Sequence, residues 1–490
     1  MTRMRWVWEL MVFAPLSVLA LYAIAPFRNN WIICFMLLLP LVLVFLLSSA
    51  VRVGFQNTAA LLKSFTWWHW LVFFAVISGL NFHTEVRDVK DVSANPLDPQ
   101  ALFRIVLEVA VALILLKRLM NNQTPWLRYL FRGLFSALTV FAIISLASTL
   151  WSVNPSWTLY KSFEYAFDLI LVVSVFLSVS SMQEYERLLD WIWALTGFLM
   201  AVAWVSAILD PAHGFVYGVE GLLLIPQLNG VWPAQSSNGI GTYGALIAIV
   251  ALARLLLHSE KRTSRGWYEL VLGFGLVTMV MADCRSAIAG FLVGVILLLI
   301  LTRRFLTGFL LGLGGIVVAL FTGLGDVVQN YLVRGQQQQL LTSLTGRTDW
   351  WSIAWKMIQV HPLIGWGAHA GGRFIVLPLA NQPGLSDVDS SIFEPLLDTG
   401  VFGLFFLLLA LAGTWWYLLR GVHSPLLNSR QRRFTAECIA VFAVITVRCF
   451  FVSNLIRHPA FYFMAVIGVA EIIRRLLKSG SQAGPIAASG

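Results

Sequence analysis

The chain has 490 residues, of which 58% are hydrophobic and only 12% are charged, and its net charge is +10. Soluble domains carry about twice that share of charged residues, so the composition excludes a soluble globular protein. The positive charge does not indicate nucleic-acid binding, because the basic residues fall in short loops and no basic run is interleaved with aromatic residues.

Apolar runs of bilayer-spanning length recur along the chain and predict an all-α, polytopic integral membrane protein. We predict about 14 transmembrane helices, within a range of 12 to 14 because several runs are short. The predicted spans are 7–26, 31–50, 66–80, 101–116, 129–149, 166–180, 190–209, 239–257, 266–282, 286–302, 304–322, 399–419, 434–452 and 459–474.

These spans divide the chain into five parts. Residues 1–120 hold about four N-terminal helices, with room for an extra pair, and 121–322 form a transmembrane core with loops at 150–165 and 210–238. A large polar loop follows at 323–398, then the C-terminal helices at 399–478 and a small polar tail, 479–490, that we predict to be disordered. Lys and Arg gather in alternate loops and in the two termini, which predicts that both termini are cytoplasmic and the long loops lie on the far side.

The large loop contains a short amphipathic helix, predicted over 349–360. Trp350, Ile353, Ala354 and Met357 recur at helical spacing, with Thr348 as the N-cap, and His361-Pro362 ends the pattern. The helix is too short to cross a bilayer, so we expect it to lie at the outer membrane–water boundary.

Two arginines on the far side are candidate anion-binding residues. Arg285 stands in a three-residue polar turn between two spans, and Arg347 lies just before the amphipathic helix, where its charge opposes the helix dipole. The alternatives are a snorkelling anchor for Arg285 and an ion pair with Asp349 for Arg347. Two guanidiniums at a lipid boundary suit a lipid-linked diphosphate, which they would bind without a metal.

Three carboxylates before the span at 399 could act as a general base: Asp387, Asp389 and Glu394. The alternative is that they are solvated loop acids. Arg448, near the outer end of its span, either snorkels or lines the same cleft. The histidine and cysteine spacings predict no metal site, and no P-loop or dinucleotide-binding motif predicts a cofactor.

Several motifs on the far side resemble the O-antigen ligase/polymerase superfamily. They are Leu150-Trp-Ser-Val-Asn-Pro155, Asp283-Cys-Arg-Ser-Ala-Ile-Ala-Gly290, Gly346-Arg-Thr-Asp-Trp-Trp351, His361-Pro-Leu-Ile-Gly-Trp-Gly367 and the Leu-Leu-Asp-Thr-Gly-Val-Phe-Gly run at 396–403. The resemblance covers about 150–420. It implies a helical C-type glycosyltransferase of the bacterial inner membrane, with a periplasmic active site and metal-independent, inverting transfer from an undecaprenyl-diphosphate-linked oligosaccharide.

The resemblance also implies roles for individual residues. Arg285 and Arg347 match the arginines that would hold the donor diphosphate, and Asn238 resembles the asparagine before the middle span. Ligases usually carry a His-Asn pair where this chain has Asp389-Ser390, so Asp389 would take the place of the ligase base.

This departure favours a polymerase that joins lipid-linked repeat units into an exopolysaccharide or O-antigen chain. The alternatives are a ligase that transfers the glycan to lipid A–core, a transporter of lipid-linked oligosaccharides and a scaffold protein. A transporter would place its arginines in a central cavity at mid-membrane depth. Predicted partners are the lipid-linked oligosaccharide, the glycan or lipid A–core acceptor, the bilayer, and proteins of polysaccharide export or chain-length control.

Overall fold

The computed structural model describes residues 99–121, 126–179, 181–216, 226–257, 262–304, 347–382, 385–457 and 460–482, together with isolated positions between 54 and 76 and at 306. The described part is almost entirely helical, as predicted. The predicted spans 7–26, 31–50 and 304–322 and the tail 483–490 lie outside the described residues, and 66–80 is described only at isolated positions.

The helices coincide with the predicted spans to within a few residues at most ends. Before the large loop they are α6 Pro99–Asn121, α7 Trp126–Leu130, α8 Phe135–Ala147, η2 Ser148–Leu150, α9 Pro155–Ser178, α10 Met182–Leu209, α11 Pro211–Gly214, α12 Ser237–Leu257, α13 Arg262–Met281 and α14 Arg285–Leu301. After position 346 they are α18 Arg347–Val360, η4 Gly372–Val376, α19 Leu377–Leu379, α20 Phe393–His423, α21 Ser429–Cys449 and α22 Ala460–Gln482.

Three of the described helices, α10, α12 and α20, are long and apolar enough to cross a membrane. The segments Phe135–Leu150 and Arg285–Leu301 are apolar but shorter. Together with the composition, these helices indicate a membrane protein.

Local sequence sets several helix starts. Asn154 caps α9 by accepting a hydrogen bond from the Trp157 amide at 3.1 Å, and Pro155 occupies the first turn, where its missing N–H costs nothing. A capping box formed by Asn428 and Gln431 starts α21.

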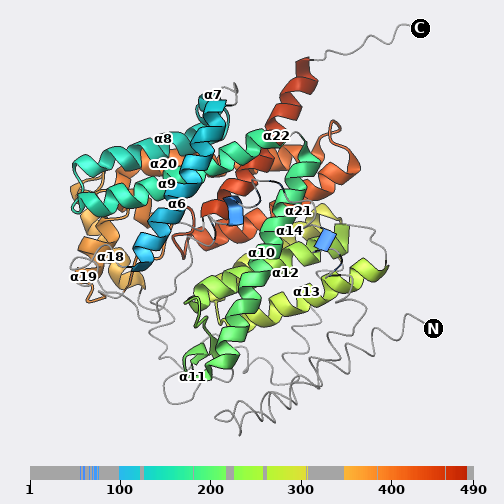
Figure 1. The fold of residues 1–490 in the computed structure, drawn as a ribbon, viewed down its shortest axis with the longest axis horizontal. Helices are drawn as coiled ribbons and strands as arrows, with labels where there is room; N and C mark the ends of the chain where they lie inside the picture. Colours follow the sequence, from blue (N-terminus) through green and yellow to red (C-terminus); the bar gives the residue numbers. More distant parts are fainter. Residues whose placement is uncertain are drawn as a thin grey trace.

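The described helices form two packed groups (Figure 1). In one, α8 and α9 pack together, and α20 packs along α8 and α22; in the other, α12 packs against α13 and α14. Helix α21 joins the groups, because it contacts α12 and α14 on one side and α20 on the other. Its central residues are buried, and most of them belong to the main hydrophobic core.

The turn-rich loop 210–238 adds a small exception to the all-α prediction. Strand β1, Phe215–Val216, pairs antiparallel with β2, Gln227–Leu228. The loop then returns to α12, so that Asn238 lies in the first turn of that helix.

Candidate functional site

Two of the sequence motifs form one hydrogen-bonded unit. The Trp366 amide donates to the Leu397 carbonyl at 3.0 Å, and the Gly367 amide donates to the Asp398 carbonyl at 2.8 Å. The side chain of Asp398, which is buried, accepts from the amides of His369 at 2.8 Å and Gly371 at 3.0 Å. The loop 361–371 is therefore fixed on the first turns of α20.

A glycine makes this contact sterically feasible. Gly400 has φ 68° and interrupts the helical backbone of α20. A Cβ at this position would lie 2.1 Å from the Leu363 carbonyl oxygen, so only glycine allows the two segments to approach.

Helix α18 begins at Arg347, two residues earlier than predicted, and ends at Val360, just before His361-Pro362. Trp350, Ala354 and Ile358 are its buried face, so the predicted stripe is confirmed at Trp350 and Ala354. The indole N–H groups of Trp350 and Trp351 both donate to the Val388 carbonyl, at 3.2 and 2.8 Å. These bonds hold the segment of the candidate carboxylates against the helix.

Arg347 and Asp389 form an ion pair. Nε and Nη2 of Arg347 donate to Oδ2 of Asp389 at 3.1 and 2.9 Å. Asp389, rather than the alternative Asp349, is thus a close partner of this guanidinium. Burial and the neighbouring Asp387 raise the pKa of Asp389 to about 6, against the opposing effect of Arg347.

Asp387 and Glu394 share a cation that the sequence analysis missed. Arg457 donates from Nη2 to Oε1 of Glu394 at 2.6 Å and lies 3.5 Å from Oδ2 of Asp387. The Ser453 hydroxyl, which has one hydrogen to donate, lies within hydrogen-bonding distance of both carboxylates. Burial alone would raise the pKa of Asp387, but Arg457 and hydrogen bonds outweigh burial and the net shift is downward. The two aspartates are therefore pushed apart in pKa, a pattern that often assigns different roles to paired carboxylates.

Arg448, Asn238 and the turn before Arg285 form a second cluster. Arg448 is fully buried; its Nη1 donates to Sγ of Cys284 at 3.0 Å and to Oγ of Ser286 at 3.2 Å, and its Nη2 donates to the Asn238 carbonyl at 3.0 Å. Cys284 in turn donates to Oδ1 of Asn238 at 3.3 Å. Arg448 therefore ties α21 to the first residues of α12 and α14, and Arg285 stands in this turn as the first residue of α14.

The segment 449–457 connects the two clusters. The Ser391 amide donates to the Cys449 carbonyl at 2.8 Å, and the Ser391 hydroxyl donates to the Val452 carbonyl at 2.8 Å. Five residues after Val452, Arg457 reaches the carboxylates. All seven predicted site residues thus lie at one end of the bundle, although convergence of Arg285 and Arg347 on one phosphate remains a prediction.

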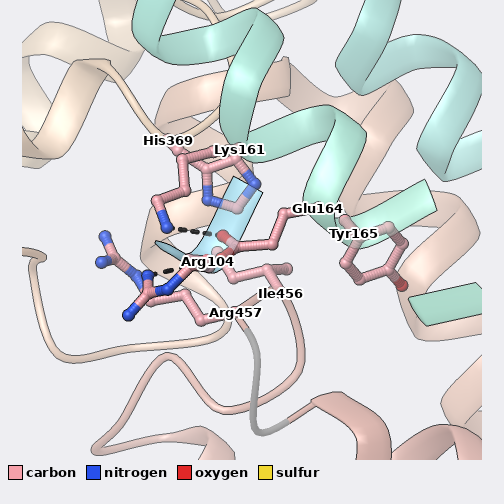
Figure 2. Close-up of a pocket in the computed structure, with 7 residues that line it drawn as sticks. All are labelled: Arg104, Lys161, Glu164, Tyr165, His369, Ile456 and Arg457. Carbon is pink, nitrogen blue, oxygen red and sulfur yellow. Dashed lines mark hydrogen bonds and ion pairs between the residues drawn. The ribbon is translucent and has the colours of Figure 1, made fainter. Parts of the chain in front are cut away.

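A cavity of about 50 Å³ opens beside Arg457 (Figure 2). Its lining comes from α6, α9, the loop after α18 and the segment before α22: Arg104, Lys161, Glu164, Tyr165, His369, Ile456 and Arg457. Lys161 and Arg104 both contact the Glu164 carboxylate, at 2.5 and 3.5 Å. Arg104 contacts Glu164 on α9, and Glu108, one turn away on α6, also acts on it electrostatically.

The described residues bring together no group of three or more His, Cys, Asp or Glu side chains of the kind that holds a metal ion. What they do provide at this end is an arginine-bound carboxylate, a pair of carboxylates on Arg457, and several partly buried cations. Such a set can bind an anion and accept a proton from a hydroxyl group.

Residues 270–408 match a family model described as O-antigen ligase. This match supports the resemblance of the chain to the O-antigen ligase/polymerase superfamily over those residues. No curated protein matches the chain in a sequence search. The resemblance drawn from the sequence motifs is therefore confirmed.

The O-antigen ligase domain contains Arg285, Arg347 and all three candidate carboxylates. Asn238, Arg448 and Arg457 lie outside the matched residues but contact groups within or beside the domain. A missed signal for Arg457 was its position between two predicted spans, in a loop that the charge alternation assigns to the same side as Arg347.

Proposed function

We propose that this protein is a membrane glycosyltransferase that polymerises undecaprenyl-diphosphate-linked repeat units at the periplasmic face of the inner membrane. The family supports a polymerase- or ligase-type enzyme. The observation that carries the finer proposal is the Arg347–Asp389 pair, a partly buried carboxylate of raised pKa held by a permanent cation at the position where ligases usually have histidine.

In the proposed reaction, the acceptor hydroxyl oxygen attacks the anomeric carbon of the donor glycan. The bond between that carbon and the phosphate oxygen breaks, and the hydroxyl proton passes to Asp389. The lipid diphosphate leaves with the bonding electron pair, and Arg285 and Arg347 balance its charge. Attack opposite the leaving group inverts the anomeric configuration.

The pair with Arg347 suggests how donor binding prepares the base. Arg347 lowers the pKa of Asp389, because a nearby cation favours the carboxylate. When a donor phosphate takes over bonds of Arg347, Asp389 is released and becomes a stronger base. Donor binding and proton acceptance are thereby coupled.

The experiment that tests the proposal uses the purified protein with lipid-linked repeat units and two kinds of acceptor. A ladder of long glycans formed from lipid-linked units alone supports the polymerase. Transfer to lipid A–core without such a ladder supports the ligase instead, and the absence of any transfer, with intact folding, rejects both. The exposed pair Arg430–Glu186 offers the control Arg430→Gln, which removes a surface cation near the start of α21, at the end of that helix opposite Arg448, and should leave transfer unchanged.

A further inference from the structure

The cavity lined by Arg104, Lys161, His369 and Arg457 is separate from the Arg347–Asp389 pair but close to it. Asp387 lies between them: its Oδ1 accepts from the Asp389 amide at 2.9 Å, and its Oδ2 faces Arg457, which lines the cavity. A glycan whose reacting hydroxyl lies at Asp389 therefore has this cavity within reach of a neighbouring sugar or substituent.

The cavity contains polar groups with unused hydrogen-bonding capacity. His369 is 4% exposed and lines the cavity, and its Nδ1 has no hydrogen-bond partner within the described ranges. Nε of Arg457 is likewise buried and has no hydrogen-bond partner among the described residues. Buried polar groups of this kind are nearly always satisfied in a working protein, so they point to a polar occupant.

The lining is predominantly cationic. Arg104, Lys161 and Arg457 contribute three positive charges, and Glu164 is the one carboxylate among the lining residues. Further carboxylates lie near the lining residues: Asp387 and Glu394 contact Arg457, and Glu108 acts on Arg104. Only the lining residues border an occupant directly, and three of them are cations.

The size of the cavity limits what enters it. Pockets that enclose a small-molecule ligand measure roughly 300–1,000 Å³, far more than the 50 Å³ here. A whole sugar ring does not fit, whereas a group of three or four heavy atoms does. Helix α9 also places aromatic rings next to one of the lining cations: Nζ of Lys161 lies 5.5 Å from the ring centroid of Trp157 and 4.7 Å from that of Tyr160.

We propose that this cavity receives a small anionic substituent of the glycan, the carboxylate of a uronic acid or a phosphate, and so selects acidic repeat units. The inference rests on the proposed function for the identity of the glycan. The cations of the lining bind the anion, and His369 completes the hydrogen bonding to the same substituent.

The test measures binding and needs no turnover. Purified protein in lipid nanodiscs is titrated with three short oligosaccharides that differ at one position: one bearing glucuronic acid, one with that carboxyl reduced to give glucose, and one bearing a sugar phosphate. We expect the acidic oligosaccharide to bind at least about tenfold more tightly than the neutral one, since charge-assisted hydrogen bonds are the stronger kind. Binding of both anionic compounds no tighter than that of the neutral compound overturns the proposal.

Two variants locate the preference. Lys161→Met removes one cation, and His369→Asn removes the imidazole while keeping a residue that tolerates the φ of 60° at this position. Both should reduce the preference for acid, whereas the surface control Arg430→Gln should not. A preference that survives in both variants, with unchanged thermal unfolding, overturns the assignment.

The arms also separate this inference from the proposed function. Tighter binding of the acidic compound without any transfer from lipid-linked units rejects the polymerase but supports the anion subsite. Transfer without a preference for the anionic compounds supports the polymerase but rejects the anion subsite. Tight binding of the phosphate compound alone assigns a phosphorylated sugar, and tight binding of the uronic acid alone assigns a carboxylate.

Discussion

Asp389 has a backbone conformation that restricts which residues can replace it. Its φ is 56°, in the left-handed region that Asn, Asp and His adopt more readily than other non-glycine residues. The histidine that ligases usually carry at this position obeys the same restriction. The position therefore admits different bases without a change of backbone, which is what a change of acceptor between family members would need.

Asp389→Asn should separate proton acceptance from folding. Asparagine suits the same backbone and keeps an oxygen for Arg347, but it cannot take a proton, so we expect transfer to fall by about 10²–10⁴-fold. The measurement is the initial rate of glycan elongation, with thermal unfolding as the fold readout. Asp349→Asn, at an exposed position in the first turn of α18, is the matched control; equal loss in both variants would contradict the assignment.

The pH dependence follows from the pKa of about 6 at Asp389. The carboxylate is the active form, so the rate should be level above about pH 7 and should fall about tenfold per unit well below pH 6. Because Arg347 lowers this pKa, Arg347→Gln should move the midpoint to higher pH in whatever activity remains. A midpoint near 4, the value of a solvated aspartate, would exclude Asp389 as the base.

The sequence analysis proposed Arg347 and Asp389 as site residues but could not pair them. Pairing joins positions 42 residues apart through the fold, and no periodicity encodes such a contact. Arg457 and Lys161 were missed for the same reason, because each is a single charge near a helix end and gains its role only from partners on other segments.

At the scale of elements, the prediction of helices was much more successful. Apolar run length, a local signal, placed both ends of α12 correctly, whereas α9 begins at Pro155, well before its predicted span 166–180, because its first turns carry polar residues. The buried stripe of α18 was predictable from its spacing, but its surroundings were not. Trp350 and Trp351 donate to Val388, so at least part of the aromatic face covers the carboxylate segment.

Gly400→Ala should destabilise the protein by disrupting the contact between α20 and the loop 361–371. The new Cβ would meet the Leu363 carbonyl oxygen at 2.1 Å on a backbone of φ 68°, and strained positions of this kind cost about 1–3 kcal/mol even without a clash. The measurement is the thermal unfolding midpoint in detergent. Gly273→Ala in α13, where nothing lies within 4 Å of an added Cβ, is the control and should be neutral or stabilising; similar behaviour of the two variants would contradict the argument.

At the scale of the whole molecule, the candidate site is assembled by segments that are far apart in sequence. The turn at 282–286, the loop 361–371, the carboxylates at 387–394 and the segment 449–457 meet at one end of the bundle. At the other ends of α12 and α21, Arg254 binds Glu437 and Asp190 in a separate ion cluster. The two ends thus have different chemistry, which is the arrangement expected when substrate is handled on one face.

This assembly allows a direct test of whether Arg285 and Arg347 act on one anion. Each single change to Gln removes charge-assisted hydrogen bonds, worth about 1.5–3 kcal/mol, and should lower kcat/KM for the lipid-linked donor by about tenfold or more. If both guanidiniums bind the same diphosphate, losing the first already weakens the grip of the second. The double variant should then cost less than the sum of the single variants by at least about 1 kcal/mol.

The corresponding double-mutant cycle between Arg285→Gln and Arg430→Gln is the control. Arg430 lies in the first turn of α21, pairs with Glu186 and has no part in the proposed diphosphate site. In this control, the free-energy cost of the double variant in kcat/KM should equal the sum of the costs of the two single variants. If Arg285 and Arg347 add in the same way, they bind separate groups and the shared-diphosphate mechanism is wrong. If they couple while the control pair does not, the coupling runs through the substrate, since Arg347 begins α18 and Arg285 begins α14 on two separate elements.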